Sequence, residues 1–330
     1  MKLFIAFLFF LSSFLYAQDE YVLGEGYQVG DSPIFLGGYF SVDYRKKDEE
    51  DRYRVDDISF MSYGGNDTLS YLAEFEFKEF YVETRDNENS TIERNHKLYI
   101  ERLYVDYNID ENYNLRLGKY NSPIGFWNLM PINVLRETSS SPILNNIIYP
   151  KYTTGVDLSY STFSQGELKL DFILQDNTAI DDDDYNNYDI DKHYALGISY
   201  EEDDYTFKVN GGYFSKRDKQ IEISDYTYAL ISARYDDDRY QFLAEAGIQN
   251  SKEKDHNYAG YVQGLYRFTY QHIAVIRLES YKDELQNKND NIAIFGYTYR
   301  PLYPVALKAE YQQHSADNEN QIIFSFSVLF

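Results

Sequence analysis

The sequence predicts an all-β fold: a transmembrane, antiparallel, up-and-down β-barrel of 16 strands. Segments in which apolar and polar residues alternate recur along the chain, each about as long as a tilted strand needs to cross a bilayer. The connections between these segments alternate between short and long. The final segment, QIIFSFSVLF, carries an apolar row at every second position, which suits a strand that faces lipid and closes a barrel.

The chain begins with features of a secretory signal peptide. Lys2 precedes the apolar run Leu3–Leu11, which is too short for a spanning helix. We expect cleavage after Ala17, so that residues 1–17 are the signal peptide; an uncleaved anchor helix is the less favoured alternative. Residues 18–32 then form a short periplasmic N-terminal segment, and residues 33–330 form the barrel.

Sixteen segments have the length and the alternation of barrel strands. We place them at 34–44, 53–62, 68–79, 97–108, 112–120, 153–162, 166–175, 193–201, 204–215, 225–236, 239–250, 257–268, 271–282, 292–300, 304–314 and 321–330.

The lengths of the connections predict how these strands are oriented. Seven connections are short turns, and the other eight, such as 45–52, 80–96 and 176–192, are mostly longer. Outer-membrane barrels have short periplasmic turns and longer outside loops. An even strand count puts both chain ends on the periplasmic side, and sixteen strands leave an aqueous channel unless it is plugged.

The strand faces agree with a barrel in lipid. In segment 68–79, Leu69, Ala73 and similar residues lie on one face, and Glu74, Glu76 and Lys78 lie on the other. We therefore expect one face to contact lipid and the other to line a polar lumen. Segment 97–108 is less regular, because Glu101 and Arg102 are adjacent and both belong inside only if a β-bulge intervenes.

Composition excludes several classes of protein. The net charge of −23 argues against binding to nucleic acid, whose phosphates require a basic surface. The chain has no cysteine and therefore no disulfides. Its 36 tyrosines are suited to the boundary between lipid and water.

We expect no catalytic residues, no metal and no cofactor. The five histidines lack zinc-ligand spacing, and the chain has no Gly-x-Ser-x-Gly elbow. The acidic run Asp181–Asp184 offers oxygen ligands for a divalent cation. It lacks the spacing of an EF-hand, so a solvated outside loop is the favoured interpretation.

The connection at residues 121–152 is the longest in the chain and is rich in apolar residues, including Trp127 and Ile148. A loop of this composition should not stand in water, and long loops without regular structure are usually functional. We expect it to fold inward between strands 5 and 6, or against a neighbouring subunit, and to constrict the lumen.

These features resemble those of bacterial porins, in which the loop after the fifth strand narrows the pore. The run LRLGKYNSPIGFW (Leu115–Trp127) is similar to the strand-and-loop signature of the phosphate-selective porin O/P-like superfamily of Gram-negative bacteria. The C-terminal aromatic strand resembles the assembly signal of outer-membrane barrels. The resemblance implies the barrel assembly machinery, outer-membrane lipid and lipopolysaccharide as partners, and a homotrimer. The dense basic ladders of that superfamily are not evident, so phosphate selectivity does not carry over.

Charged residues on inward faces and in the long loop are candidates for the constriction and the pore lining. They are Arg102, Arg116, Lys119, Arg136, Glu137, Lys151, Lys308 and Glu310. Charged rings at a narrow point set ion preference, and here they predict a mild anion preference or a transverse field. The sequence supports equally well the alternative that Arg116 and Arg136 only pair with carboxylates and brace the loop.

The sequence thus predicts an outer-membrane, non-enzymatic porin that passes small hydrophilic solutes and ions by passive diffusion. A channel specific for an oxyanion or an organic acid is one alternative. A non-conducting structural or adhesive barrel is the other.

Overall fold

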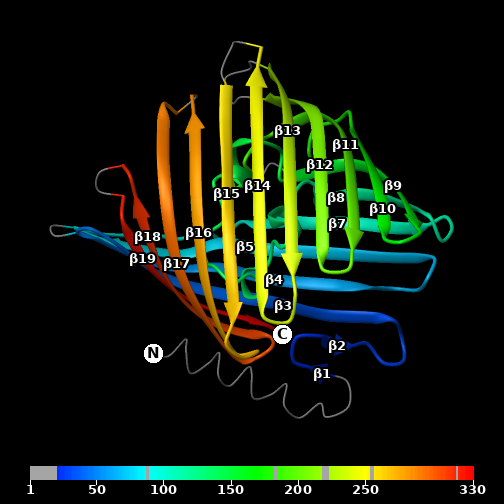
Figure 1. Ribbon diagram of the computed structural model, residues 1–330. Coiled ribbons are helices and arrows are strands. Elements are labelled where there is room, and N and C mark those ends of the chain that lie inside the picture. Colours follow the sequence, from blue (N-terminus) through cyan, green and yellow to red (C-terminus); the bar gives the residue numbers. More distant parts are fainter. Residues whose placement is uncertain are drawn as a thin grey trace.

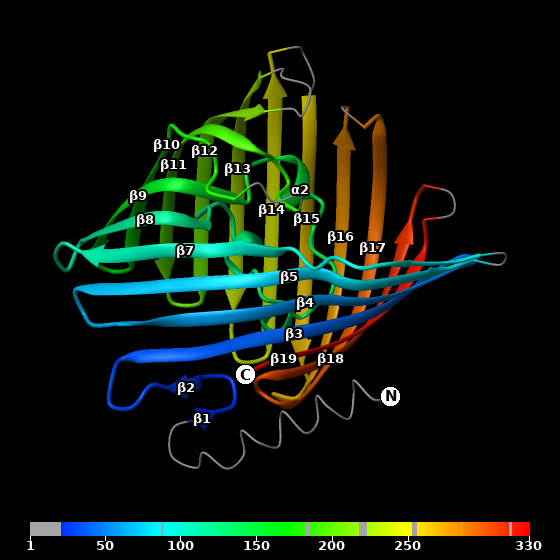
Figure 2. The same ribbon diagram turned by 180° about the vertical axis from the view of Figure 1, so that it is seen from behind.

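A closed antiparallel barrel is the architecture of the computed structural model, which describes residues 21–330 except 87–88, 182–184, 218–222, 253–255, 285 and 317–318. Sixteen long strands form the barrel, and the short strands β1, β2 and β6 extend its sheet (Figures 1 and 2). The predicted fold class is therefore confirmed. The predicted signal peptide lies outside the described residues. No helix in the described part of the chain is long and apolar enough to span a membrane.

The strand positions follow the alternating pattern of the sequence closely. The barrel strands are β3 (Ile34–Lys47), β4 (Glu50–Gly65), β5 (Leu69–Arg85), β7 (Leu98–Asn108), β8 (Tyr113–Asn121), β9 (Tyr152–Phe163), β10 (Glu167–Gln175), β11 (Ile190–Glu202), β12 (Tyr205–Arg217), β13 (Ile223–Asp236), β14 (Tyr240–Ser251), β15 (His256–Arg267), β16 (His272–Asp283), β17 (Lys288–Leu302), β18 (Val305–His314) and β19 (Gln321–Leu329). The short strands are β1 (Tyr21–Val22), β2 (Gly26–Gln28) and β6 (Ser90–Glu93).

The first three barrel strands are longer than expected. The sequence predicted loops at 45–52 and 80–96, but β3 and β4 are joined by a tight turn and β5 continues to Arg85. These polar segments stay in the sheet because their charges pair across strands. Arg52 lies 2.8 Å from a Glu79 carboxylate oxygen, and Lys46 lies 3.6 Å from an Asp51 carboxylate oxygen. A polar stretch between apolar strands was therefore wrongly interpreted as loop.

The bulge required at Glu101 and Arg102 is present. The register between β5 and β7 shifts by one residue at this point, so that Glu74 faces Arg102 while Phe75 faces Ile100. The extra residue leaves both charged side chains on the inner face. There, Arg102 forms an ion pair with Glu74, and Glu101 forms one with Lys78.

The last strand closes the barrel against the first, as predicted. Strand β19 pairs with β3 from Gln321–Lys47 to Leu329–Tyr39. The backbones of Gly38 and Phe330 then exchange two hydrogen bonds, of 2.7 and 2.8 Å. Beyond the C-terminal end of β19, the edge of β3 pairs instead with strand β2, with Tyr27 opposite Leu36. The described part of the segment predicted at 18–32, from Tyr21 onward, therefore forms a small hairpin at the rim of the barrel, beside the closing strands (Figure 2).

Each strand has an apolar outer face and a mixed inner face. On β11, Leu196 and Ile198 are 44% exposed on the outside, and the outward-facing rings of Tyr194 and Tyr200 flank them along the strand. Alternation places Ser199 on the inner face. An apolar band between two aromatic girdles is the outer surface of a membrane barrel.

Candidate solute pathway and its inner loop

The long connection between β8 and β9 folds into the lumen. We call residues 122–151 the inner loop. It contains the 3₁₀ turns η1 (Trp127–Leu129) and η2 (Asn133–Leu135) and the one-turn helix α2 (Leu144–Ile147). Its base is closed by hydrogen bonds. The Ser122 amide donates to the Lys151 carbonyl over 2.8 Å, and the Asn128 side-chain amide donates to the carbonyls of both residues.

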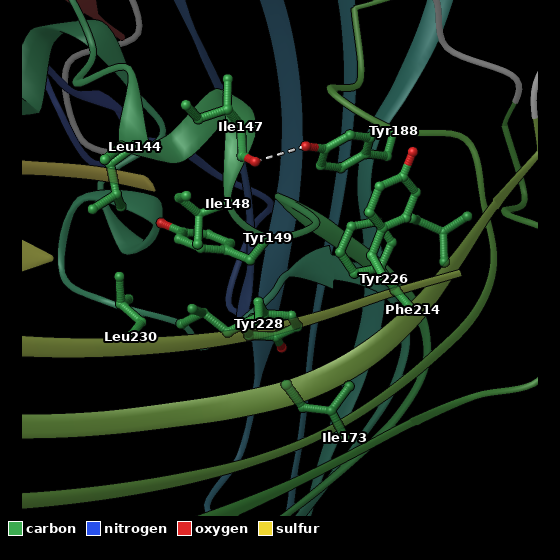
Figure 3. Close-up of a cluster of buried hydrophobic side chains, with 13 residues drawn as sticks. Leu144, Ile147, Ile148, Tyr149, Ile173, Tyr188, Phe214, Tyr226, Tyr228 and Leu230 are labelled. Atoms are coloured by element: carbon green, nitrogen blue, oxygen red, sulfur yellow. Dashed lines mark hydrogen bonds between the residues drawn. The ribbon is translucent and has the colours of Figure 1, made fainter. Parts of the chain in front are cut away.

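The apolar residues of the inner loop pack on the inside of the barrel wall. Four loop residues are buried in one cluster with side chains of β10, β11, β12, β13 and β15: Ile124, Leu144, Ile148 and Tyr149. Figure 3 shows Leu144, Ile148 and Tyr149 of the loop beside the wall residues Ile173, Phe214, Tyr226, Tyr228 and Leu230. Tyr188 from the loop between β10 and β11 joins the cluster and donates a hydrogen bond to the Ile147 carbonyl (2.9 Å; Figure 3). The apolar content of the loop is therefore explained by packing within its own barrel.

Charged wall residues satisfy the polar backbone groups of the inner loop. Four cations donate to loop carbonyls: Lys208 to Gly125 (3.1 Å), Lys308 to Asn133 (2.5 Å), Arg300 to Val134 (2.6 Å) and Arg277 to Ser140 (3.1 Å). Three carboxylates accept from loop amides: Glu245 from Phe126 (2.6 Å), Glu279 from Ile143 (2.9 Å) and Glu310 from Ser139 (3.0 Å). Buried backbone groups need such partners, so these wall charges fix the loop in place.

Arg277 is the most completely enclosed of these wall cations, with no exposed surface. Its guanidinium also donates to the Thr138 hydroxyl (2.9 Å), to the Ser140 hydroxyl (2.7 Å) and to Glu279 (2.7 Å). It lies 5.2 Å from the ring centre of Trp127. Arg277 was not among the predicted site residues, because nothing in the local sequence pattern indicates contact with a segment 137 residues away.

The candidate residues on the wall fall into two groups. Lys308 and Glu310 are buried and hold the inner loop, which favours the bracing interpretation for them. Lys119 is also buried and donates to the Ile100 carbonyl over 2.6 Å. Arg116 differs, because it is 30% exposed while it forms an ion pair with Asp106 and stacks on the ring of Tyr104 at 4.1 Å.

The candidate residues of the inner loop are also separated. Glu137 pairs with Arg300 at 3.1 Å, and Lys151 closes the loop base through its backbone. Arg136 donates to the Ser141 hydroxyl over 2.9 Å and lies 6.0 Å from the ring centre of Trp127. Burial lowers its pKa, and the charges of Asp57 and Asp56 on β4 oppose this effect. The charges of the two aspartates therefore act on Arg136 from the barrel wall, and of these three residues only Arg136 was predicted as a site residue.

A second feature missed from the sequence is an aromatic platform. The Phe126 ring lies 4.8 Å from the Lys208 ammonium and 5.3 Å from the Arg234 guanidinium. Lys208 is directly opposite Ser199 and Ser232, and Ser199 is opposite Lys169. Cross-strand register therefore brings these cations and hydroxyls into one row below the inner loop.

The inner loop gives a first testable prediction at Gly125. Its φ of +66° is left-handed, and an added Cβ would lie 2.4 Å from the Glu245 carboxylate that holds the loop. Gly125→Ala should lower the free energy of unfolding by about 2–4 kcal/mol, combining backbone strain with a lost brace. Denaturant titration of the refolded protein measures it. Gly30→Ala is the matched control, because Gly30 has φ +54° but open space around it. Equal losses in both variants would contradict a specific role of the brace.

Comparisons with known proteins support the fold. No family model matches the sequence, and no curated protein matches it. Solved structures do match. The outer-membrane channel DcaP of Acinetobacter baumannii aligns with a TM-score of 0.61 at 12% identity, covering 93% of this chain and 100% of that one. The anion-selective porin from Comamonas acidovorans aligns with 0.61 at 10% identity, covering 90% and 99%. A trimer form of OmpT, an outer-membrane protein of Vibrio cholerae, aligns with 0.59 at 9% identity, covering 90% and 99%. At these identities the likeness shows the porin fold. The resemblance to the porin O/P-like superfamily stays a prediction.

Proposed function

We propose that this protein is an outer-membrane porin that passes small hydrophilic solutes and ions by passive diffusion. The observation that carries the proposal is the position of the inner loop. It enters a sixteen-strand barrel between the fifth and sixth strands. Apolar packing fixes the loop on one wall and, through Ile132 and Val134, also on β3, β4 and β18, and charged wall residues hold it in place. We place the remaining path beside the loop, at the wall that carries Arg116. Its width sets a size limit for solutes.

A mild anion preference is the second part of the proposal. In four ion pairs on the inner face, the cation is more exposed than its carboxylate partner: Arg45–Asp43 (28% and 3%), Arg52–Glu79 (31% and 22%), Arg116–Asp106 (30% and 16%) and Lys169–Asp171 (37% and 8%). Long basic side chains reach further into the water than the short carboxylates beneath them. Arg54–Glu79, Arg300–Glu137, Arg234–Glu201 and Arg267–Asp236 show the reverse order. We expect the four exposed cations to give the lining a mild preference for anions.

Zero-current potentials in a potassium chloride gradient test this proposal. The wild type should favour chloride over potassium by roughly twofold, and the double variant Arg116→Gln/Lys169→Gln should bring the ratio to about one or below, because charged rings set ion preference. Lys192→Gln is the control, since Lys192 lies on the outer face of β11 and is 51% exposed. A cation preference in the wild type would contradict the anion proposal and leave the porin proposal intact.

The same recordings separate the alternatives. Conductance that saturates with one oxyanion or organic acid would favour a solute-specific channel, and the row of Lys169, Ser199 and Lys208 is the feature that supports it. Complete absence of conductance in planar bilayers would favour a structural or adhesive barrel.

The remaining proposals concern location and partners. An exported barrel with an aromatic closing strand supports insertion by the barrel assembly machinery into the outer membrane, where it meets lipopolysaccharide. A homotrimer is supported by the trimer form of the Vibrio cholerae neighbour. The inner loop packs within its own barrel, so small outward residues such as Ala233, Ala244 and Gly264, which line a groove of about 540 Å³, are better candidates for a subunit contact.

A further inference from the structure

A groove of about 640 Å³ crosses the outer face where the barrel closes. We call it the seam groove. One row of directly opposed residues forms part of it: Tyr297, Ala309, Phe324, Tyr44 and Tyr53. An adjacent row runs in the same way from Tyr299 on β17 to Tyr81 on β5. Ala309 in the first row and Val42 and Val55 in the second are smaller than the aromatic residues around them, and all of these residues line the groove.

The length and direction of the seam groove match an acyl chain. The first row crosses five strands, which spans about 19 Å at a strand spacing of about 4.8 Å. One leaflet of hydrocarbon is about 15 Å thick. Barrel strands are tilted, so a row perpendicular to them crosses the membrane obliquely. Here the row runs from near the short turn after β17 to the long-loop end of β4. A chain lying in the groove would therefore cover a leaflet obliquely.

The end of the seam groove nearest the long loops carries cations. The Arg85 guanidinium lies 5.2 Å from the Tyr53 ring centre, and the Arg94 guanidinium lies 5.7 Å from that of Tyr81. Lys46, also on the outer face, is 53% exposed. The two neighbouring carboxylates are partly engaged by tyrosines, since Asp51 accepts from Tyr44 (2.6 Å) and Glu83 accepts from Tyr81 (3.0 Å).

Arg94 forms no ion pair with any of the described residues. Arg85 pairs with Glu83 only through the Nε atom of the arginine, over 2.7 Å. The planar guanidinium group suits bidentate binding of phosphate. The outer face thus changes from apolar, through aromatic, to cationic in the order in which a membrane changes from hydrocarbon to phosphate.

We propose that the seam groove binds a phosphorylated lipid of the outer leaflet, of the lipid A type. One acyl chain lies along the groove over Ala309, and a phosphate is held by Arg85 and Arg94. The proposal rests on the outer-membrane location proposed above. It does not depend on conduction, so a failure of either proposal leaves the other open to its own test.

Binding of defined lipids to the delipidated, folded barrel tests the proposal. The probes are bisphosphorylated lipid A and zwitterionic phosphatidylethanolamine, titrated in detergent and counted by native mass spectrometry. Arg85→Gln/Arg94→Gln removes both charges, and Ala309→Trp fills the groove. Lys192→Gln and Ala73→Phe are matched controls, because they alter an outer-face lysine and an outward alanine that do not line the groove. Heat-modifiable migration in gels confirms that each variant is folded.

The wild type and both controls should bind lipid A more tightly than phosphatidylethanolamine. The double arginine variant should lose about tenfold or more in lipid A affinity, as expected when charge-assisted hydrogen bonds are removed. Ala309→Trp should lose binding of both lipids at this site. Equal binding of both lipids by the wild type would overturn the proposal, as would unchanged lipid A affinity in the double variant. If Ala309→Trp dissociates an oligomer and leaves lipid binding unchanged, the seam groove is a subunit contact and the proposal is wrong.

Discussion

Replacing Arg277 with methionine is expected to release part of the inner loop and to raise the single-channel conductance by roughly a factor of two, since lumen width sets conduction. Arg277 joins Thr138 and Ser140 of the loop to Glu279 of the wall, and it has no exposed surface. Its loss leaves the Glu279 carboxylate buried without its cation, which typically costs about 3–5 kcal/mol. The wall and the loop can relieve this cost by separating and admitting water.

Planar-bilayer recordings measure the effect as a higher mean conductance with more frequent current fluctuations. Arg267→Met is the matched control, because Arg267 is an inward-facing arginine on the neighbouring strand that bonds Asp236 and the Asp237 carbonyl near a short turn. It should leave the conductance close to that of the wild type. If Arg277→Met conducts with wild-type amplitude and noise, the inner loop does not depend on this brace.

Placing a lysine on the lipid-facing side of β11 should destabilise the barrel strongly. Ile198 is 44% exposed on the outside, between the outward rings of Tyr194 and Tyr200. Ile198→Lys should lower the free energy of unfolding by about 2–4 kcal/mol, the usual effect of a lysine near the bilayer midplane. Reversible denaturant unfolding from lipid vesicles measures it.

The adjacent Ser199 provides the control on the opposite face. Ser199→Lys adds the same group to the inner face, directly opposite Lys169 and Lys208. It should change stability by less than about 1 kcal/mol and strengthen the anion preference, because it adds a positive charge to the lining. Similar losses of stability in the two variants would mean that this strand does not separate lipid from water.

Much of the fold could be predicted from the sequence, because the signals are local. In each strand, apolar and polar residues alternate with a period of two, and each turn is specified by a few neighbouring residues. The errors came at the ends of β3, β4 and β5, where charged residues such as Lys46, Asp51 and Arg52 were predicted to lie in a loop. Whether a charged residue belongs to a strand depends on the partner that the neighbouring strand places opposite it, and a single segment does not contain that information.

Less of the candidate site could be predicted. The loop at 121–152 and its inward fold followed from its length and apolar content. Arg136 was predicted as a site residue, but Asp56 and Asp57, whose charges act on it, were not. Lys308 and Glu310 were expected to line the path, and the structure uses them to hold the inner loop.

The sequence by itself determined the membrane barrel, the number of strands, the closure of the last strand on the first, and which loop enters the lumen. Those properties depend on periodicity and on connection length. Only the tertiary structure decided which charges face water and which brace the loop. Glu310 accepts a hydrogen bond from the Ser140 amide, which is 170 residues away in the chain. This contact depends on the register and tilt of all sixteen strands together. No local pattern specifies that geometry, because it exists only once the barrel has closed.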